Sequence, residues 1–200
     1  MCGDLHKRSA VDRTHTSEAQ CGEKRKNMIE KEENFRNGTI AELAKQIALA
    51  ARTAPKARGT DNLEIAVVTG HDIERLAQRM LSIADATGQQ FFARDAENIR
   101  QCGAVLLIGS RVAPLGLNCG YCGFATCGEK YREVPCFFNA NNLGIAIGSA
   151  AARAADLRID NRVMFSAGRT ALEMDLLPGC TMILALPLAV KGKNPFFDRK

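Results

Sequence analysis

Four cysteines in the middle of the chain offer its clearest pattern for chemistry. Cys119, Cys122, Cys127 and Cys136 follow a C-x2-C-x4-C-x8-C spacing, so four of the eight cysteines fall within eighteen residues. Thiolates separated by two residues can bind one metal centre from a single turn of backbone. Four thiolates with no histidine nearby suit an iron–sulfur cluster or a structural zinc ion. The spacing therefore predicts a metal centre, and the ligand count leaves both kinds open.

The residues around these cysteines favour an iron–sulfur cluster. Glycine follows Cys119, Cys122 and Cys127, and glycine tolerates the positive φ values that a backbone wrapping around a metal centre needs. We expect such turns to leave amide groups free to point at sulfur. No charged side chain occurs from Val112 to Gly128. The expected weakly polar surroundings tune a redox centre and give zinc nothing that it needs.

Other interpretations of the cysteines stay open. Zinc knuckles place aromatic residues between their ligands, and Tyr121 and Phe124 would suit one, but there the third ligand is histidine and the last spacing is shorter. A zinc-stapled module would contact nucleic acid through a basic surface. Two disulfides are disfavoured, because close spacing in a chain of intracellular character is typical of metal or redox chemistry.

Length and composition fit one globular domain that contains this loop. The 200 residues are 46% hydrophobic and 24% charged, and the net charge is +5. Basic residues are scattered among acidic ones, which argues against nucleic acid as a partner. The longest apolar stretches, 143–152 and 180–190, are shorter than the roughly 20 residues that cross a bilayer, and the first residues lack a signal-peptide core. We expect a cytoplasmic protein without membrane contact.

Hydrophobic periodicity predicts alternating helices and strands in one α+β domain at 39–200, preceded by a polar extension at 1–38. Helices are expected at 40–53 behind a Thr39 capping box, from His71 to before Gly88, near 95–101 and at 143–157. A last, short helix is expected to follow a cap at Ser166 and to run through Arg169 to Leu177. Buried strands are expected at 63–69 and 104–109, and a third apolar strand at 181–187.

The helix at 143–157 is unusually rich in small residues. Gly144 and Gly148 lie one above the other on it, and each interior glycine costs about 0.5–1 kcal/mol relative to alanine. Their presence predicts either the close approach of a partner subunit or flat cofactor, or tight packing in the core.

The cysteine segment and the whole chain resemble known families. Residues 118–127, Asn-Cys-Gly-Tyr-Cys-Gly-Phe-Ala-Thr-Cys, resemble the signature of [4Fe–4S] domains in the B subunit of the Rnf complex and in the corrinoid iron–sulfur protein. The chain as a whole resembles the uncharacterised prokaryotic ferredoxin-domain family; the matching stretches are 50–62, the cysteine signature, 142–150, 159–164 and 192–199. These resemblances imply one [4Fe–4S] cluster in a ferredoxin-like segment at 116–137.

The order of several segments is also similar to that of nitroreductase-like flavoproteins. A helix ending at Ala54-Pro55, then Asn62, a central helix of small residues and a basic tail occur in this order. The resemblance implies an α+β fold, a three-layer sandwich with the cysteine-rich loop inserted, and a homodimer packed through the central helix with FMN at the subunit interface. The implied contacts to FMN are Arg52, Lys56 and Asn62 for the flavin, and Lys193 and Arg199 for its phosphate.

The chain departs from the nitroreductase pattern in two places. The Arg-Arg-Ser-x-Arg segment ahead of the first helix is missing, and Lys56 stands where serine is usual. The remaining features predict an iron–sulfur oxidoreductase or electron-transfer protein that feeds FMN, a redox partner protein or a small-molecule electron acceptor. A redox sensor without turnover is the alternative within the same chemistry.

Overall fold

A four-stranded antiparallel sheet forms the centre of the structure, a computed structural model that describes residues 29–197. The strand order is β1 (Leu63–Val68), β2 (Ala104–Arg111), β4 (Cys180–Ala189) and β3 (Asp160–Asn161). β3 is short because the chain leaves the sheet after Asn161 and returns only for a single bridge between Met164 and Ala185.

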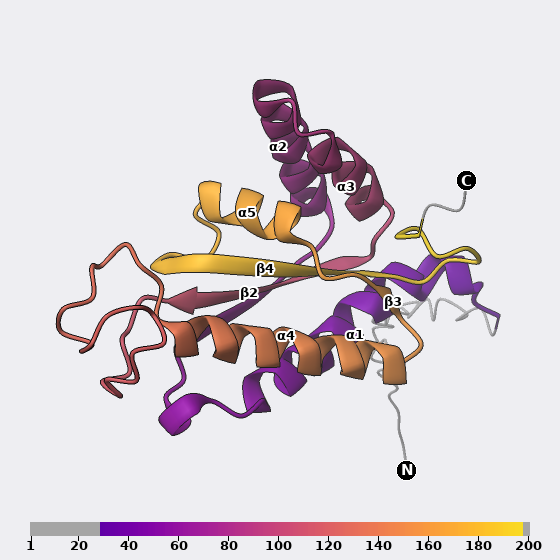
Figure 1. The fold of residues 1–200 in the computed structure, drawn as a ribbon. Helices are drawn as coiled ribbons and strands as arrows, with labels where there is room; N and C mark the ends of the chain where they lie inside the picture. Colours follow the sequence, from indigo (N-terminus) through magenta and orange to yellow (C-terminus); the bar gives the residue numbers. More distant parts are fainter. Residues whose placement is uncertain (1–28, 198–200) are drawn as a thin grey trace, which may run out of the picture. The chain divides into compact units, whose positions relative to one another are not determined.

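Helices cover both faces of this sheet (Figure 1). One face carries α1 (Glu32–Thr53) and α4 (Phe137–Asp156). The other carries α2 (His71–Thr87), α3 (Gln90–Arg100) and α5 (Phe165–Glu173). The predicted α+β class and three-layer arrangement are therefore confirmed.

The side chains of the two central strands alternate between two hydrophobic cores. In β2, Val105 and Leu107 pack with α2, α3 and α5, whereas Leu106 and Ile108 pack with α1 and α4. Successive side chains of a strand point to opposite faces, so a strand covered on both faces is apolar throughout. This is why 104–109 could be predicted as a buried strand.

The first strand differs from its prediction. β1 begins at the expected residue but lies at the edge of the sheet, and from Glu64 to Val68 its residues are only half-buried. Its β-branched residues predicted the strand correctly. The degree of burial was wrong, because sheet order decides it.

Three helix starts also differ from their predictions. α1 begins at Glu32 rather than at residue 40, so Thr39 lies inside the helix and forms no capping box. Glu32 and Glu33 occupy the first turn, where the helix dipole favours acidic side chains. α3 and α4 start earlier than predicted, at Gln90 and Phe137.

The last helix, α5, runs from Phe165 to Glu173, so it ends before the predicted Leu177, and Ser166 lies within it rather than at its cap. The Ser166 hydroxyl donates a hydrogen bond to the carboxylate of Asp95 on α3 and caps nothing. Gly168 lets α5 rest on β4, because a Cβ there would lie 2.1 Å from the Ile183 carbonyl oxygen.

The C-terminal segment after β4 returns to the domain. Phe196 is buried and Phe197 is exposed, so one of the two rings of this segment packs into the core. The Asn194 side chain donates to Asp160 at 2.9 Å. Among the described helices, none is long and apolar enough to cross a membrane.

Candidate metal centre

The four candidate cysteines lie on the loop that connects β2 to α4, here called the cysteine loop (residues 112–136; left in Figure 1). Cys119, Cys122 and Cys127 are half-buried, and Cys136 is buried directly ahead of the first residue of α4. All four are free thiols.

Glycines shape the loop at two of the three expected positions. Gly120 has a φ of 74° and Gly123 a φ of 90°, and the Gly123 amide donates to the Gly120 carbonyl at 2.9 Å. This tight turn carries Cys119 and Cys122. Gly128 has no positive φ, so its place after Cys127 has no backbone explanation.

Asn118 links the two ends of the cysteine signature. Its backbone amide donates to Sγ of Cys127 at 3.4 Å, and the Cys127 amide donates to Oδ1 of Asn118 at 2.8 Å. Asn118 has a φ of 48°, a left-handed conformation that asparagine adopts more readily than most residues. The expected amide pointing at sulfur therefore comes from Asn118.

The thiol groups of the cysteine loop do not converge on one point. Within residues 29–197, no three side chains of His, Cys, Asp or Glu converge closely enough to hold a metal ion. The ligand set thus stays a prediction. Its chemistry fits a cluster: four thiols lie on one loop that has no charged side chain from Val112 to Gly128, and one sulfur accepts an amide hydrogen bond. Cys136 also precedes a helix N-terminus, which favours nearby negative charge.

Aromatic rings lie on the cysteine loop and at the start of α4. Tyr121 contacts Phe137 edge to face, with ring centroids 5.1 Å apart, and Phe124 contacts Tyr131 in the same way at 5.3 Å. Tyr121 and Tyr131 are each 68% exposed. The rings therefore form an apolar but accessible surface next to Cys122.

Buried amides fix the base of the loop. Asn139 on α4 donates to the carbonyls of Arg111 and Ala113 at 3.2 and 3.0 Å, and it accepts from Asn62 at 3.2 Å. Asn142, one turn further, accepts from the Ala57 amide at 3.0 Å, and its own Nδ2 has no partner. Sequence reasoning missed both. The signal was the set of asparagines among the otherwise apolar residues 137–148.

A further anchor of the loop is Arg58. Its guanidinium donates to the Leu115 carbonyl, and its backbone has a φ of 56°. A non-glycine residue in the left-handed region costs roughly 1–3 kcal/mol unless surrounding contacts hold it. The contact between Arg58 and Leu115 therefore helps to hold this backbone conformation.

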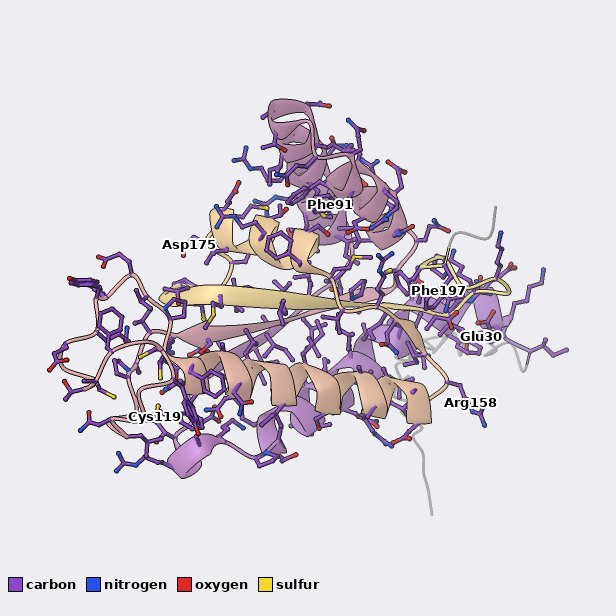
Figure 2. The ribbon with its side chains drawn as sticks, viewed as in Figure 1. Glu30, Phe91, Cys119, Arg158, Asp175 and Phe197 are labelled. Carbon is purple, nitrogen blue, oxygen red and sulfur yellow. The ribbon has the colours of Figure 1, made fainter. Side chains whose placement is uncertain are left out.

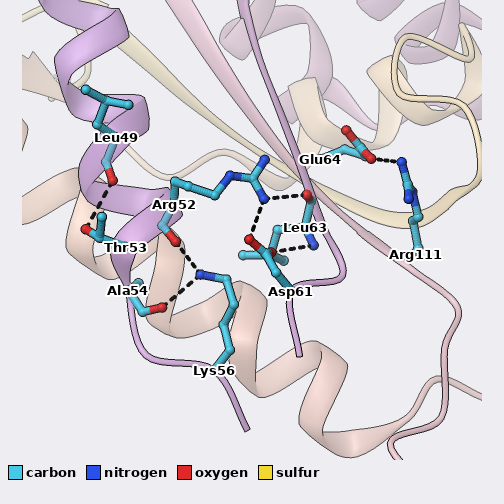
Figure 3. Close-up of polar contacts among 9 residues, drawn as sticks. All are labelled: Leu49, Arg52, Thr53, Ala54, Lys56, Asp61, Leu63, Glu64 and Arg111. Atoms are coloured by element: carbon cyan, nitrogen blue, oxygen red, sulfur yellow. Dashed lines mark hydrogen bonds and ion pairs between the residues drawn. The ribbon is translucent and has the colours of Figure 1, made fainter. Parts of the chain in front are cut away.

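Two of the predicted flavin contacts are engaged in local structure (Figure 3). Arg52 donates to Asp61 and to the Leu63 carbonyl, each at 2.8 Å. Lys56 donates to the carbonyls of Arg52 and Ala54. Partial burial raises the pKa of Asp61, but the hydrogen bonds from Arg52 and the Leu63 amide, together with the nearby positive charges, outweigh it, so the pKa is lowered. These residues close the turn before β1, next to Asn62.

The predicted phosphate contacts lie elsewhere. Asn62 bonds Asn139 in the first turn of α4, whereas Lys193 adjoins Asn194, which bonds Asp160 beyond the other end of that helix. A helix of 20 residues is about 30 Å long. One subunit therefore does not bring Lys193 to Arg52, Lys56 and Asn62. Arg199 lies outside the described residues.

The outer face of α4 is apolar and exposed. A Cβ added at Gly144 or Gly148 would meet no atom of another element within 4 Å, so tight core packing was the wrong alternative for both. Phe137 is 44% exposed and Ile145 is 37% exposed on this helix. The face is defined by residues 137, 141, 144, 145, 148, 152 and 155.

Two further cysteines lie away from the loop. Burial raises the pKa of the Cys102 thiol to about 12, and burial also raises the pKa of Cys180. Thiolates are the reactive and metal-binding form of cysteine. Both residues therefore behave as core side chains.

Comparisons with known proteins agree with the fold. A nitroreductase with bound FMN from Bacteroides fragilis matches with a TM-score of 0.54 and 11% identity, over 80% of this chain and 82% of that one. A nitroreductase with bound FMN from Desulfitobacterium hafniense matches with a TM-score of 0.52 and 16% identity, over 79% and 82%. At such identities the likeness concerns the fold alone.

A sequence relative identifies the family. An uncharacterised protein of Archaeoglobus fulgidus is 37% identical over 182 residues, which cover 86% of this chain and 98% of that protein. The family described as uncharacterised proteins containing a ferredoxin domain matches residues 132–199, a range that includes Cys136 but not the three earlier cysteines of the loop. The chain belongs to this family of ferredoxin-domain proteins and has a nitroreductase-like fold.

Proposed function

We propose that the protein is an iron–sulfur redox protein in which Cys119, Cys122, Cys127 and Cys136 bind one [4Fe–4S] cluster. The observation that carries the proposal is the cysteine loop itself: four free thiols lie on one loop, and one sulfur accepts a backbone amide hydrogen bond. The ferredoxin-domain family supports it. Bound there, a [4Fe–4S] cluster supplies one-electron transfer.

The chain contributes position and surroundings to this site. Asn139 and Arg58 hold the first arm of the cysteine loop against α4 and the turn before β1. The N-terminus of α4 favours negative charge at Cys136. Tyr121 and Phe137 form an apolar but exposed surface beside the loop. Amide hydrogen bonds to sulfur and solvent exposure are features through which a protein tunes such a centre.

We further propose a homodimer packed through α4 that binds FMN between its subunits. The support is the nitroreductase-like fold together with the outer face of α4, where two interior glycines face no other part of the described subunit. A flavin that contacts both Lys193 and the Arg52–Asn62 segment needs residues from two subunits, because one subunit separates them. The dimer would pass electrons to a partner protein or a small-molecule acceptor.

Analysis of one anaerobic sample tests these proposals. Iron, acid-labile sulfide, zinc and flavin are measured per chain on protein purified without oxygen, and its visible spectrum is recorded before and after dithionite. A brown protein that bleaches on reduction is expected. A colourless protein with one zinc per chain would instead support the zinc-stapled module, in which Tyr121 and Phe124 contact nucleic acid.

The flavin and sensor questions need separate readouts. Stoichiometric flavin absorbance after reconstitution with FMN is expected, and its absence would reject the flavin site while leaving the cluster standing. Turnover of an electron acceptor by the loaded protein distinguishes an oxidoreductase from a redox sensor. A sensor would change its oligomeric mass on cluster loss without any turnover.

A further inference from the structure

Asn118 makes two contacts with Cys127 that no other described residue makes with a loop cysteine. Its amide donates to Sγ of Cys127, and its side-chain oxygen accepts from the amide of the same residue. The two bonds run in opposite directions between one pair of residues. They therefore fix both the distance between residues 118 and 127 and the direction in which the Cys127 thiol points.

The conformation of Asn118 serves this contact. Its φ of 48° lies in the left-handed region, where glycine is the default residue and asparagine the best-tolerated alternative. Glycine at this position would relieve the backbone but would leave the Cys127 amide without its acceptor. Asparagine satisfies both demands, because its short side chain reaches across the loop.

The pair also encloses the rest of the signature. Cys119 follows Asn118 directly, and the turn at Gly120 and Gly123 carries Cys122 between the two ends. Closing a flexible loop of this length costs conformational entropy, and the cost falls on metal binding unless the loop is closed beforehand. The two hydrogen bonds between Asn118 and Cys127 close the loop before any iron binds, so metal binding loses less conformational entropy.

We propose that Asn118 is a positioning residue for the cluster, which orients the Cys127 thiolate and keeps an amide hydrogen bond on its sulfur. The inference rests on the proposed iron–sulfur function. Hydrogen bonds to cluster sulfurs stabilise the more negative, reduced state, so this bond raises the reduction potential. Both residues are partly or fully exposed, which gives the pair little weight in the stability of the fold itself.

The test compares three variants with the wild type. Asn118→Gly keeps the left-handed backbone and removes the acceptor, whereas Asn118→Asp keeps an acceptor oxygen in the same place. Arg158→Gly is the matched control: Arg158 is a second non-glycine residue with positive φ, at 59°, and it lies at the opposite end of α4 from Cys119 (Figure 2). All four proteins are loaded anaerobically with iron and sulfide.

The readouts are iron release to a chelator, the midpoint potential and the melting temperature of the unloaded protein. Asn118→Gly is expected to release iron about tenfold faster, the lower end of the effect of losing a group that orients a ligand, and to have a more negative midpoint potential. Asn118→Asp should restore slow release. All the unloaded proteins should melt within a few degrees of one another.

The outcomes separate this inference from the proposed function. If wild type and Asn118→Gly load equally, release iron at equal rates and share one potential, Asn118 has no positioning role although the cluster stands. Equal acceleration in Arg158→Gly would overturn the role as well, since the effect would then be general. A wild-type protein that takes up neither iron nor sulfide rejects the proposed function, and this inference with it.

Discussion

Nδ2 of Asn62 donates to Oδ1 of Asn139 at 3.2 Å, which joins the turn before β1 to the first turn of α4. Asn139 is 1% exposed and also holds the carbonyls of Arg111 and Ala113, where the cysteine loop leaves β2. One buried amide therefore determines how the loop starts relative to the helix that follows it.

Asn139→Ala should destabilise the protein and loosen the loop. The substitution leaves buried carbonyl and amide groups without partners, which costs about 1–3 kcal/mol. Urea unfolding of the unloaded protein measures this loss. Asn37→Ala, at an exposed asparagine of α1, is the control and should not destabilise the protein by more than about 0.5 kcal/mol. Equal stability of the two variants would show that the Asn139 contacts contribute nothing.

The glycines of α4 can be tested against a glycine of α1. Gly38 and Gly148 are both exposed helix residues at which a Cβ would meet nothing. Gly38→Ala should stabilise the chain by about 0.5–1 kcal/mol without changing its mass in solution. Gly148→Ala should shift a dimer toward monomer, because the added methyl group separates the packed helices. Light scattering over a concentration series gives the mass.

The contradicting result for α4 is equally specific. If Gly148→Ala behaves like Gly38→Ala, with higher stability and an unchanged dissociation constant, then no partner approaches α4 at this glycine. The proposed subunit interface would have to lie elsewhere.

Cysteine reactivity should divide the described thiols into two groups. With the unloaded protein at pH 8, iodoacetamide should modify Cys119, Cys122 and Cys127 well before Cys102 and Cys180. The last two are buried, and burial raises the pKa of both thiols. Peptide mass spectrometry at increasing times gives the order. Rapid labelling of Cys102 in folded protein would contradict its place in the core.

The ion pair between α2 and α3 predicts a pH dependence of stability. Hydrogen bonds from Arg100 and Gln78 lower the pKa of Glu74 from 4.5 to about 2. A carboxyl group with a lowered folded-state pKa stabilises the protein above its unfolded-state pKa. This contribution is lost as the pH falls from about 4.5 toward 2. Glu74 is exposed, so solvent and salt reduce the effect.

Glu74→Gln provides the comparison for this pair. Its melting temperature should lie below that of the wild type at pH 7, and the two should converge as the pH falls below about 4.5, because protonation removes the same charge. Melting curves between pH 7 and pH 2.5 at low salt measure the difference. A constant gap across this range would mean that the charge of Glu74 is not responsible.

Much of the fold was predictable because local pattern and tertiary structure agree. The apolar run of β2 is covered on both faces, and the helix from His71 ends at Gly88, whose φ of 73° is the left-handed cap that glycine provides. The start of α1 was missed because the apparent capping box at Thr39 outweighed the acidic turn at Glu32. Both sequence patterns are typical of a helix start, and only the tertiary packing of α1 decides between them.

The candidate site was only partly predictable, for a different reason. The four cysteines are close in sequence, so spacing alone identified them. Asn139, Asn142 and Arg58 act through contacts with segments 26 to 85 residues away. Hydrophobic periodicity in the sequence does not predict such long-range hydrogen bonds. The resemblance to dimeric nitroreductases placed Lys193 and Arg52 around the same FMN. The structure of one subunit does not test that placement, because the two residues would come from different subunits.

The measurement that most directly tests the central claim is the iron and acid-labile sulfide content of Cys122→Ser beside Cys102→Ser. Both are purified without oxygen together with the wild type. The wild type and Cys102→Ser should each contain about four iron and four sulfide per chain, the composition of one [4Fe–4S] cluster, and Cys122→Ser should lose most of both. Wild-type protein without sulfide, or Cys122→Ser with the full content, would contradict a cluster held by the cysteine loop.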